Sequence, residues 1–188
     1  MKRVAIVKGG TRGIGAAVSR GLKDAGYKVA ALYHASDESA QAFAAQSGVA
    51  IYKWDVGDFD ACAEGVARVE ADLGPVEVLV NNAGGAPEAD AATVSPRFSE
   101  SIIRLNLIAP LNFAQKANAV MQEQETGGVI INIASVSATR PSPGTAAYGA
   151  AKAGLLSLTE SVAVEWAPKV RVTAIIAGMI RTEQAHLH

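Results

Sequence analysis

The sequence has little of what would point to an unusual environment or a charged partner. It contains a single cysteine, Cys62, which cannot form a disulfide within the chain, so a reducing cytoplasm is expected. The formal net charge of −1 gives no basic excess that would favour a nucleic acid or an anionic membrane as partner. The first apolar run, residues 4–7, is cut short by Lys8 and a glycine turn. Because it is too short for a signal-peptide core or a membrane span, it predicts a buried strand.

Internal repeats, blocks of one charge and low-complexity linkers are also absent, so the sequence predicts one domain over residues 1–188. Short β-rich apolar runs alternate instead with Ala-rich amphipathic segments. The expected strands are Arg3–Lys8, Lys28–Tyr33, Ala50–Trp54, Val76–Asn81, Val129–Ala134 and Val170–Ile176. The expected helices are Gly15–Ala25, Glu38–Gln46, Phe59–Leu73, Phe98–Glu123 and Ala147–Trp166. This alternation predicts an α/β fold with a doubly wound parallel sheet, and Pro110 predicts a kink or an irregularity in the fourth helix.

A glycine-rich turn, Lys-Gly-Gly-Thr-Arg-Gly-Ile-Gly, joins the first expected strand to the first expected helix. Gly9 permits a tight turn, Gly13 lets a pyrophosphate approach the backbone, and Gly15 allows the helix to pack closely on the strand. The exposed amides and the positive end of the helix dipole favour a phosphate at this place. We therefore expect a dinucleotide site, and the alternative is a glycine-rich turn that binds nothing.

Tyr148 and Lys152 stand four positions apart, and Ser135 precedes the tyrosine by thirteen residues at the end of an apolar run. On a helix, Tyr148 and Lys152 would lie on one face. A positive charge beside a phenol favours the phenolate, which brings the group toward general acid–base work at neutral pH. The alternative for a tyrosine and a lysine at this spacing is a surface pair whose polar ends reach solvent.

Further motifs follow in chain order. They are Asp55-Val56 after the third strand, Asn81-Asn82-Ala83-Gly84 after the fourth, Asn106 in the fourth helix, and Ala177-Gly178-Met179-Ile180-Arg181-Thr182 after the last strand. Together with the first turn, spaced Gly-x-x-x-Gly-x-Gly, they make the sequence resemble the short-chain dehydrogenase/reductase family over nearly its whole length. The stretch through Ala83 is similar to acetoacetyl-CoA and 3-oxoacyl reductases. The resemblance implies a Rossmann domain that binds NAD(P) and an alcohol dehydrogenase or carbonyl reductase activity.

The resemblance also implies roles for four residues in catalysis. Tyr148 would donate a proton to a substrate carbonyl oxygen while a hydride arrives from the cofactor, and Ser135 would hydrogen-bond the same oxygen. Lys152 would bind the nicotinamide ribose, and Asn106 would hold a water that links Lys152 to solvent. Ser137 competes with Ser135 for its role, but the interval from Ser135 to the tyrosine is the one found in the family.

Cofactor contacts are carried over in the same way. Asp55 and Val56 would hold the adenine, whereas Ile180 and Thr182 would contact the nicotinamide carboxamide. Asn81 would support the central strand, although Asn81-Asn82 is also typical of a simple turn. The full set of residues expected to bind cofactor is Gly9, Thr11, Arg12, Gly13, Ile14, Gly15, Tyr33, His34, Asp55, Val56, Asn82, Ala83, Gly84, Tyr148, Lys152, Gly178, Ile180 and Thr182.

The choice between NAD and NADP depends on the charge at the end of the second strand. An acidic residue there would bind the ribose 2′-hydroxyl and repel a 2′-phosphate. Tyr33 and His34 occupy this place, and no carboxylate follows until Asp37. Arg12 in the glycine turn can pair with a 2′-phosphate, so NADP(H) is the expected cofactor. If Arg12 only covers the adenine, the preference stays open.

The sequence departs from the family pattern in three places. Lys8 stands where the family has a small hydroxyl residue, and Ala177 stands where it has a proline, which loosens the loop beside the nicotinamide. Relatives continue beyond the segment that ends at Thr182, through a helical cover over the substrate and a final strand. We therefore expect a sheet without its C-terminal strand and a pocket without its lid.

The sequence thus predicts an NADP(H)-dependent oxidoreductase that interconverts a carbonyl and a secondary alcohol, with a 3-oxoacyl thioester as candidate substrate. A nucleotide-sugar epimerase is one alternative, disfavoured by the glycine spacing, and a dinucleotide-binding module without activity is another. Members of the family pair through the helices expected at Phe98–Glu123 and Ala147–Trp166, so a homotetramer or a dimer is expected. His186 and His188 are interpreted as part of a frayed end, and no metal is expected.

Overall fold

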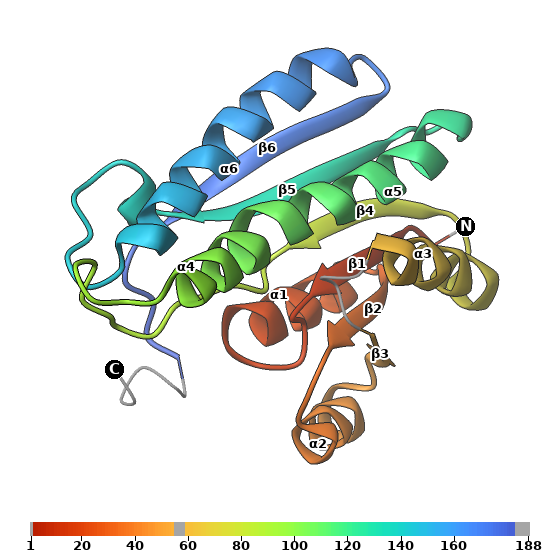
Figure 1. The fold of residues 1–188 in the computed structure, drawn as a ribbon. Helices are drawn as coiled ribbons and strands as arrows, with labels where there is room; N and C mark the ends of the chain where they lie inside the picture. Colours follow the sequence, from red (N-terminus) through yellow and green to blue (C-terminus); the bar gives the residue numbers. More distant parts are fainter. Residues whose placement is uncertain (1, 55–58, 183–188) are drawn as a thin grey trace.

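The fold is that of a computed structural model, which describes residues 2–54 and 59–182. Within these residues, six parallel strands form one sheet in the order β3-β2-β1-β4-β5-β6 (Figure 1). The strands are β1 Val4–Lys8, β2 Lys28–Tyr33, β3 Ala50–Lys53, β4 Val76–Asn81, β5 Gly128–Ser135 and β6 Val170–Ala177. The first and last residue of every strand lie within one residue of the prediction. Parallel strands that are buried on both faces consist of nearly continuous apolar runs, so their ends are easy to locate in the sequence. The predicted doubly wound α/β fold is confirmed.

Helices connect the strands and cover the sheet. They are α1 Gly13–Asp24, α2 Asp37–Ser47, α3 Phe59–Leu73, α4 Pro96–Ile103, α5 Ala109–Glu123 and α6 Ala146–Glu165, with a π-helical turn η1 Arg104–Ile108 and a 3₁₀ turn η2 Val136–Ala138. No helix in the described part of the chain is long and apolar enough to cross a membrane.

The central strand β1 is buried along its whole length, and its side chains alternate between two apolar clusters. Val4 and Ile6 belong to a cluster completed by α3 and α5, with Phe113 among its members. Ala5 and Val7 belong to a second cluster, to which α1 and α2 contribute Ala16 and Phe43. The period of two along the strand therefore places helices on both faces of the sheet.

The predicted helix Phe98–Glu123 is wrong in one respect, since it is three pieces: α4, the π turn η1 and α5. The irregularity expected from Pro110 is present, directly before that residue. Proline has no N–H, so the carbonyl of Asn106, four residues earlier, cannot receive its usual α-helical hydrogen bond. The turn adapts with a wider bond, in which Ala109 N–H reaches back five residues to the Arg104 carbonyl.

A buried chain of polar side chains ties the sheet to two of these helices. Asn81 and Asn132 are partners in the register of β4 and β5, and Asn81 Nδ2 donates to Asn132 Oδ1 over 3.0 Å. Asn81 Nδ2 also donates to the Pro110 carbonyl, 3.2 Å away at the start of α5. Asn132 Nδ2 donates to Thr159 Oγ1 on α6 over 2.9 Å. The predicted support of the central strands by Asn81 is thus extended to helices that carry candidate site residues.

Candidate active site

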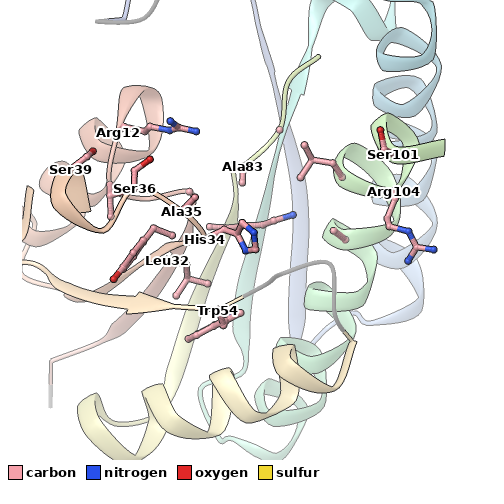
Figure 2. Close-up of a pocket in the computed structure, with 17 residues that line it drawn as sticks. Arg12, Leu32, His34, Ala35, Ser36, Ser39, Trp54, Ala83, Ser101 and Arg104 are labelled. Carbon is pink, nitrogen blue, oxygen red and sulfur yellow. The ribbon is translucent and has the colours of Figure 1, made fainter. Parts of the chain in front are cut away.

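The carboxyl ends of the strands border a cavity of about 680 Å³. Figure 2 shows Arg12, Ser36 and Ser39 on one side of it, Ser101 and Arg104 on the opposite side, and Trp54 below. Arg12 belongs to the glycine turn, Ser36 and Ser39 to the start of α2, and Arg104 to η1. The cavity therefore lies where parallel α/β sheets bind their ligands, over the strand ends beside the point where the strand order reverses.

The glycine turn forms the wall between this cavity and helix α1. Gly9 has φ +67°, and a Cβ on it would lie 2.9 Å from the Ala83 side chain. A Cβ on Gly15 would overlap the Gly9 carbonyl oxygen, so only a glycine allows the helix to approach this closely. Because α1 begins at Gly13, the turn presents backbone amides at the positive end of a 12-residue helix. Such a place suits a phosphate.

The part of this cavity at the end of β2 contains the positive charge of Arg12. Tyr33 and His34, at the end of β2, line it together with Arg12, and no carboxylate occurs among its described lining residues. Asp37 stands close in sequence but pairs with Lys53 over 2.7 Å. Hydrogen bonds from Lys53 and Tyr33 hold the pKa of Asp37 below its usual value. The charge of Asp37 is thus already matched by a cation.

A second cavity, of about 320 Å³, adjoins the first. Four residues line both cavities: Gly9, Arg12, Ala83 and Gly84. The second cavity continues over Gly13, Ile14 and Asn82 to the ends of β5 and β6, where Gly178 and Thr182 contribute. Together the two cavities make an elongated site that passes over the glycine turn, a shape that fits a dinucleotide.

Ser135, Tyr148 and Lys152 meet in this second cavity. Ser135 ends β5, while Tyr148 and Lys152 come from the first two turns of α6. Lys152 Nζ lies 5.7 Å from the centroid of the Tyr148 ring. The predicted placement of both residues on one helix face is confirmed, and the surface-pair alternative is excluded because Lys152 is only 3% exposed.

Burial also sets the electrostatics of Lys152. Its Nζ donates to the Ile133 carbonyl over 2.7 Å, and Ile133 lies in β5 two residues before Ser135. Removal from water penalises the ammonium form and lowers the pKa of Lys152 from 10.5 to about 8. The lysine therefore still carries its charge at neutral pH, held beside the Tyr148 ring.

The two candidate serines have different surroundings. Ser135 is among the described residues that line the second cavity, and Ser137 is not. Ser137 lies in η2, where its N–H donates to Ser135 Oγ over 3.2 Å. One lone pair of the Ser135 oxygen thus accepts the Ser137 N–H, and the hydroxyl proton of Ser135 is available for a ligand in the cavity.

Asn106 is fully buried in η1, and its side chain bonds only to backbone among the described residues. Its Oδ1 accepts from Gly85 N–H at 3.0 Å, and its Nδ2 donates to the Gly85 and Ile102 carbonyls, each at 2.9 Å. A Cβ on Gly84 would lie 2.5 Å from this Oδ1 and 3.3 Å from Lys152 Nζ. Gly84 thus fills the gap between Asn106 and Lys152, and only a glycine fits there.

Some predicted site residues lie elsewhere. Gly15 packs behind the glycine turn and Ile180 is half exposed, and neither is among the described lining residues of the two cavities. Lys8 is completely buried and lines the first cavity, while its carbonyl accepts from the Ala83 N–H and from Asn82 Nδ2. Asp55, Val56, His186 and His188 lie outside the described residues.

Other lining residues escaped the sequence-based prediction. In the first cavity they are Leu32, Ala35, Ser36, Ser39, Trp54, Ser101, Arg104, Leu105 and Ala109. Trp54 contacts Phe113 edge to face and also lines the cavity. Its position directly after β3, at the ligand-binding edge of the sheet, is a signal that could have identified it. Arg104 reaches the cavity from a distant helix, and no local signal in the sequence marks it.

The sheet order, the glycine turn at a helix N-terminus and the elongated site define a dinucleotide-binding α/β protein. Residues 3–187 match the profile of the short chain dehydrogenase family. The chain belongs to this family, and it is an oxidoreductase of the short-chain dehydrogenase/reductase type.

Individual relatives agree with this assignment. The acetoacetyl-CoA reductases of Shinella zoogloeoides and of Rhizobium meliloti (strain 1021) are each 47% identical to the chain over 184 residues, which cover 97% of the chain and 76% of the relative. A solved structure, a short-chain dehydrogenase/reductase of Serratia marcescens determined as a double mutant, superposes with a TM-score of 0.89 at 31% identity. That match covers 97% of this chain and 76% of the Serratia protein.

Proposed function

We propose that the protein is an NADP(H)-dependent reductase that interconverts a carbonyl and a secondary alcohol, with Tyr148 as the general acid and base. One observation carries this proposal: Ser135, Tyr148 and Lys152 line a single cavity that joins the cavity beside Arg12 over the glycine turn. A ligand that spans both cavities places one end beside Arg12 and the other beside Tyr148.

The residues present fit a nicotinamide dinucleotide. The glycine cradle leaves room for a diphosphate, since a Cβ on Gly13 would meet only the Thr182 side chain, at 3.7 Å. The adenosine end would lie between Arg12 and His34, and the nicotinamide end between Gly178 and Lys152. When bound, the nicotinamide supplies or accepts the hydride.

The protein's own groups handle the proton. Tyr148 would give its phenolic proton to the carbonyl oxygen during reduction, and Ser135 would donate a hydrogen bond to the same oxygen and stabilise its negative charge. The ammonium of Lys152, 5.7 Å from the ring centroid, favours the phenolate that remains.

In a proton relay at Asn106, the side chain and the main-chain carbonyl are the two groups that could hold the water. The side chain of Asn106 is committed to Gly85 and Ile102. Its main-chain carbonyl, in contrast, lacks an α-helical donor because residue 110 is a proline. We propose that this carbonyl, rather than the side chain, holds the water that serves Lys152.

The preference for NADP(H) is supported by charge. Arg12 lines the first cavity and no carboxylate does so among the described residues. Ser36, which precedes α2 and has the unusual φ of +68°, lines the same cavity. Ser39, in the first turn of α2, lines it as well. Hydroxyls, an arginine fork and a helix N-terminus are the groups that bind a 2′-phosphate.

The substrate class is proposed from the relatives. Two of them are named acetoacetyl-CoA reductases, so a 3-oxoacyl thioester is the substrate that we propose for this chain. The work would take place in the cytoplasm, which is the compartment expected from the single cysteine.

The test follows NADPH absorbance with acetoacetyl-CoA and a panel of ketones. We expect turnover by the wild type, a loss of about a thousandfold or more in Tyr148→Phe, and NADPH binding that is still measurable in that variant. Affinity for NADH equal to or tighter than that for NADPH would overturn the choice of cofactor. NADPH binding without turnover of any carbonyl would replace the reductase by a dinucleotide-binding module.

A homo-oligomer is also proposed, from the surface of α6. Apolar and small residues occur all round this helix, yet one side is open to solvent at Ala150, Ala153 and Val164. On α4, which packs against α6, Ile103 is also exposed. Apolar side chains that are exposed on one side of a helix indicate a contact surface, so a second copy of the chain is the occupant that we propose for this face.

A further inference from the structure

The loop between β5 and α6 contains three linked hydroxyl groups, which we call the hydroxyl cluster: Ser137, Ser142 and Thr145. Ser142 Oγ donates to Ser137 Oγ over 3.0 Å, and it lies 2.6 Å from Thr145 Oγ1. Either hydroxyl can donate in the second contact, and Thr145 Oγ1 also lies 3.5 Å from the Ser142 carbonyl oxygen, to which it donates. Ser142 is therefore the centre of the cluster, because it contacts both other hydroxyls.

Each end of the cluster is joined to a candidate catalytic residue. At one end, Ser137 N–H donates to Ser135 Oγ over 3.2 Å. At the other end, Thr145 precedes the first turn of α6, and its carbonyl accepts from Gly149 N–H over 2.9 Å, next to Tyr148. A side-chain connection between η2 and the start of α6 thus passes through Ser142, in addition to the bond from Lys152 Nζ to the Ile133 carbonyl.

The packing around the cluster leaves little freedom. A Cβ on Gly149 would lie 3.0 Å from the Ser137 carbonyl oxygen and 3.4 Å from Ser142 Cβ, so the first turn of α6 rests directly on the loop. Ser137, Ser142 and Thr145 are all partly buried. Partial burial strengthens these hydrogen bonds relative to bonds in water, and it raises the cost of leaving one of them unmade.

We propose that Ser142 is a positioning residue, which fixes the distance between the Ser135 hydroxyl and the Tyr148 phenol. Both groups must reach one carbonyl oxygen, although they come from different elements of the fold. Ser142 sets their separation through its two hydroxyl bonds and contacts no substrate itself. This inference rests on the proposed reductase function, in which Ser135 and Tyr148 act on the same atom.

The experiment compares Ser142→Ala with Ser142→Thr, which keeps the hydroxyl, and with Thr139→Val as a matched control. Thr139 lies in the same loop, but its exposed hydroxyl donates only to the Val136 carbonyl, over 3.2 Å. We expect kcat for acetoacetyl-CoA to fall about tenfold in Ser142→Ala, with unchanged Kd for NADPH, and to recover in Ser142→Thr. Thr139→Val should match the wild type.

A second measurement, amide hydrogen exchange, does not depend on turnover. We expect exchange at the Ser137 and Gly149 amides to be faster in Ser142→Ala than in the wild type by about tenfold. Unchanged exchange at both amides, or an equal loss of kcat in Thr139→Val, would overturn the positioning role. If the wild type turns over no carbonyl, the reductase function falls, and exchange alone decides whether Ser142 links the two segments.

Discussion

At the scale of single residues, Lys152 shows how a side chain can be buried and charged together. Its Nζ reaches the Ile133 carbonyl and only 3% of the residue is exposed. The folded protein therefore keeps an ammonium at a cost, which appears as a pKa of about 8 in place of 10.5. That cost brings the positive charge to the Tyr148 ring.

This burial predicts a dependence of stability on pH. Between pH 8 and 10.5 the unfolded chain still binds the Lys152 proton while the folded protein has released it, so stability increases as the pH rises through this window. Below pH 8 the penalty is fully present, and its whole size is on the order of 3 kcal/mol. Lys152→Met removes it.

Urea unfolding at a series of pH values checks this expectation. The free energy of unfolding of the wild type should rise relative to that of Lys152→Met as the pH passes from 8 to 10.5. In this comparison both proteins also carry Tyr148→Phe, because Lys152 Nζ lies 5.7 Å from the centroid of this ring and would perturb its phenol, and the remaining titrating groups are common to both and cancel in the difference. Parallel curves for the two proteins across this range would contradict the buried ammonium.

The residues of the site were predictable to different degrees. Ser135, Tyr148 and Lys152 stand at family intervals, and the structure brings them into one cavity. Arg104 and Ser101 could not be predicted, because they reach the first cavity from a helix far along the chain. Contacts of this kind depend on how elements pack, which no local spacing reveals.

At the scale of elements, strands were easier to predict than helices. A strand covered on both faces has to be apolar throughout, and such runs end at turn residues. The segment Phe98–Glu123 was read as one helix because its apolar period continues across Pro110. The proline marks an irregularity, but its presence alone does not show that the irregularity is a π turn over Arg104–Ile108.

The contact of α6 with the sheet leads to a prediction about Thr159. In Thr159→Val the shape is nearly kept, but Asn132 Nδ2 loses its acceptor at 2.9 Å in a buried place. We expect the free energy of unfolding to fall by about 1–3 kcal/mol. Ser161→Ala on the same helix removes an exposed hydroxyl, which donates to the Ser157 carbonyl, and should change it by about 0.5 kcal/mol or less.

Denaturant unfolding measures both variants under one set of conditions. If Thr159→Val were as stable as Ser161→Ala, the buried chain from Asn81 to α6 would not contribute to holding the helix in place. The loss of stability, in contrast, would show that the polar side chains between β4 and β5 support the helix of Tyr148.

At the scale of the whole molecule, the exposed side of α6 predicts self-association. Val164, near the C-terminal end of α6, is 80% exposed. We expect light scattering to give a mass two or four times the 19.3 kDa of the chain. Val164→Asp should shift that mass toward the monomer, because an aspartate in an apolar interface pays a desolvation cost.

The matched control is Gln46→Asp on α2, which is exposed on the opposite face of the sheet. It adds the same charge without touching α6, so its mass should equal that of the wild type. A wild-type protein that scatters as a 19.3 kDa monomer at all concentrations would contradict association through α6.

The residues of the elongated site come from both halves of the chain, which has a consequence for recombination between related sequences. The glycine turn, the end of β2 and Ala83–Gly84 come from the first half, whereas Ser135, Tyr148 and Lys152 come from the second. The two sets approach each other at Gly84, which has room for a hydrogen but not for a methyl group. Recombination near this point would exchange the glycine turn and the end of β2 while leaving Ser135, Tyr148 and Lys152 as they are. Such an exchange succeeds only where the incoming segment also ends in glycine.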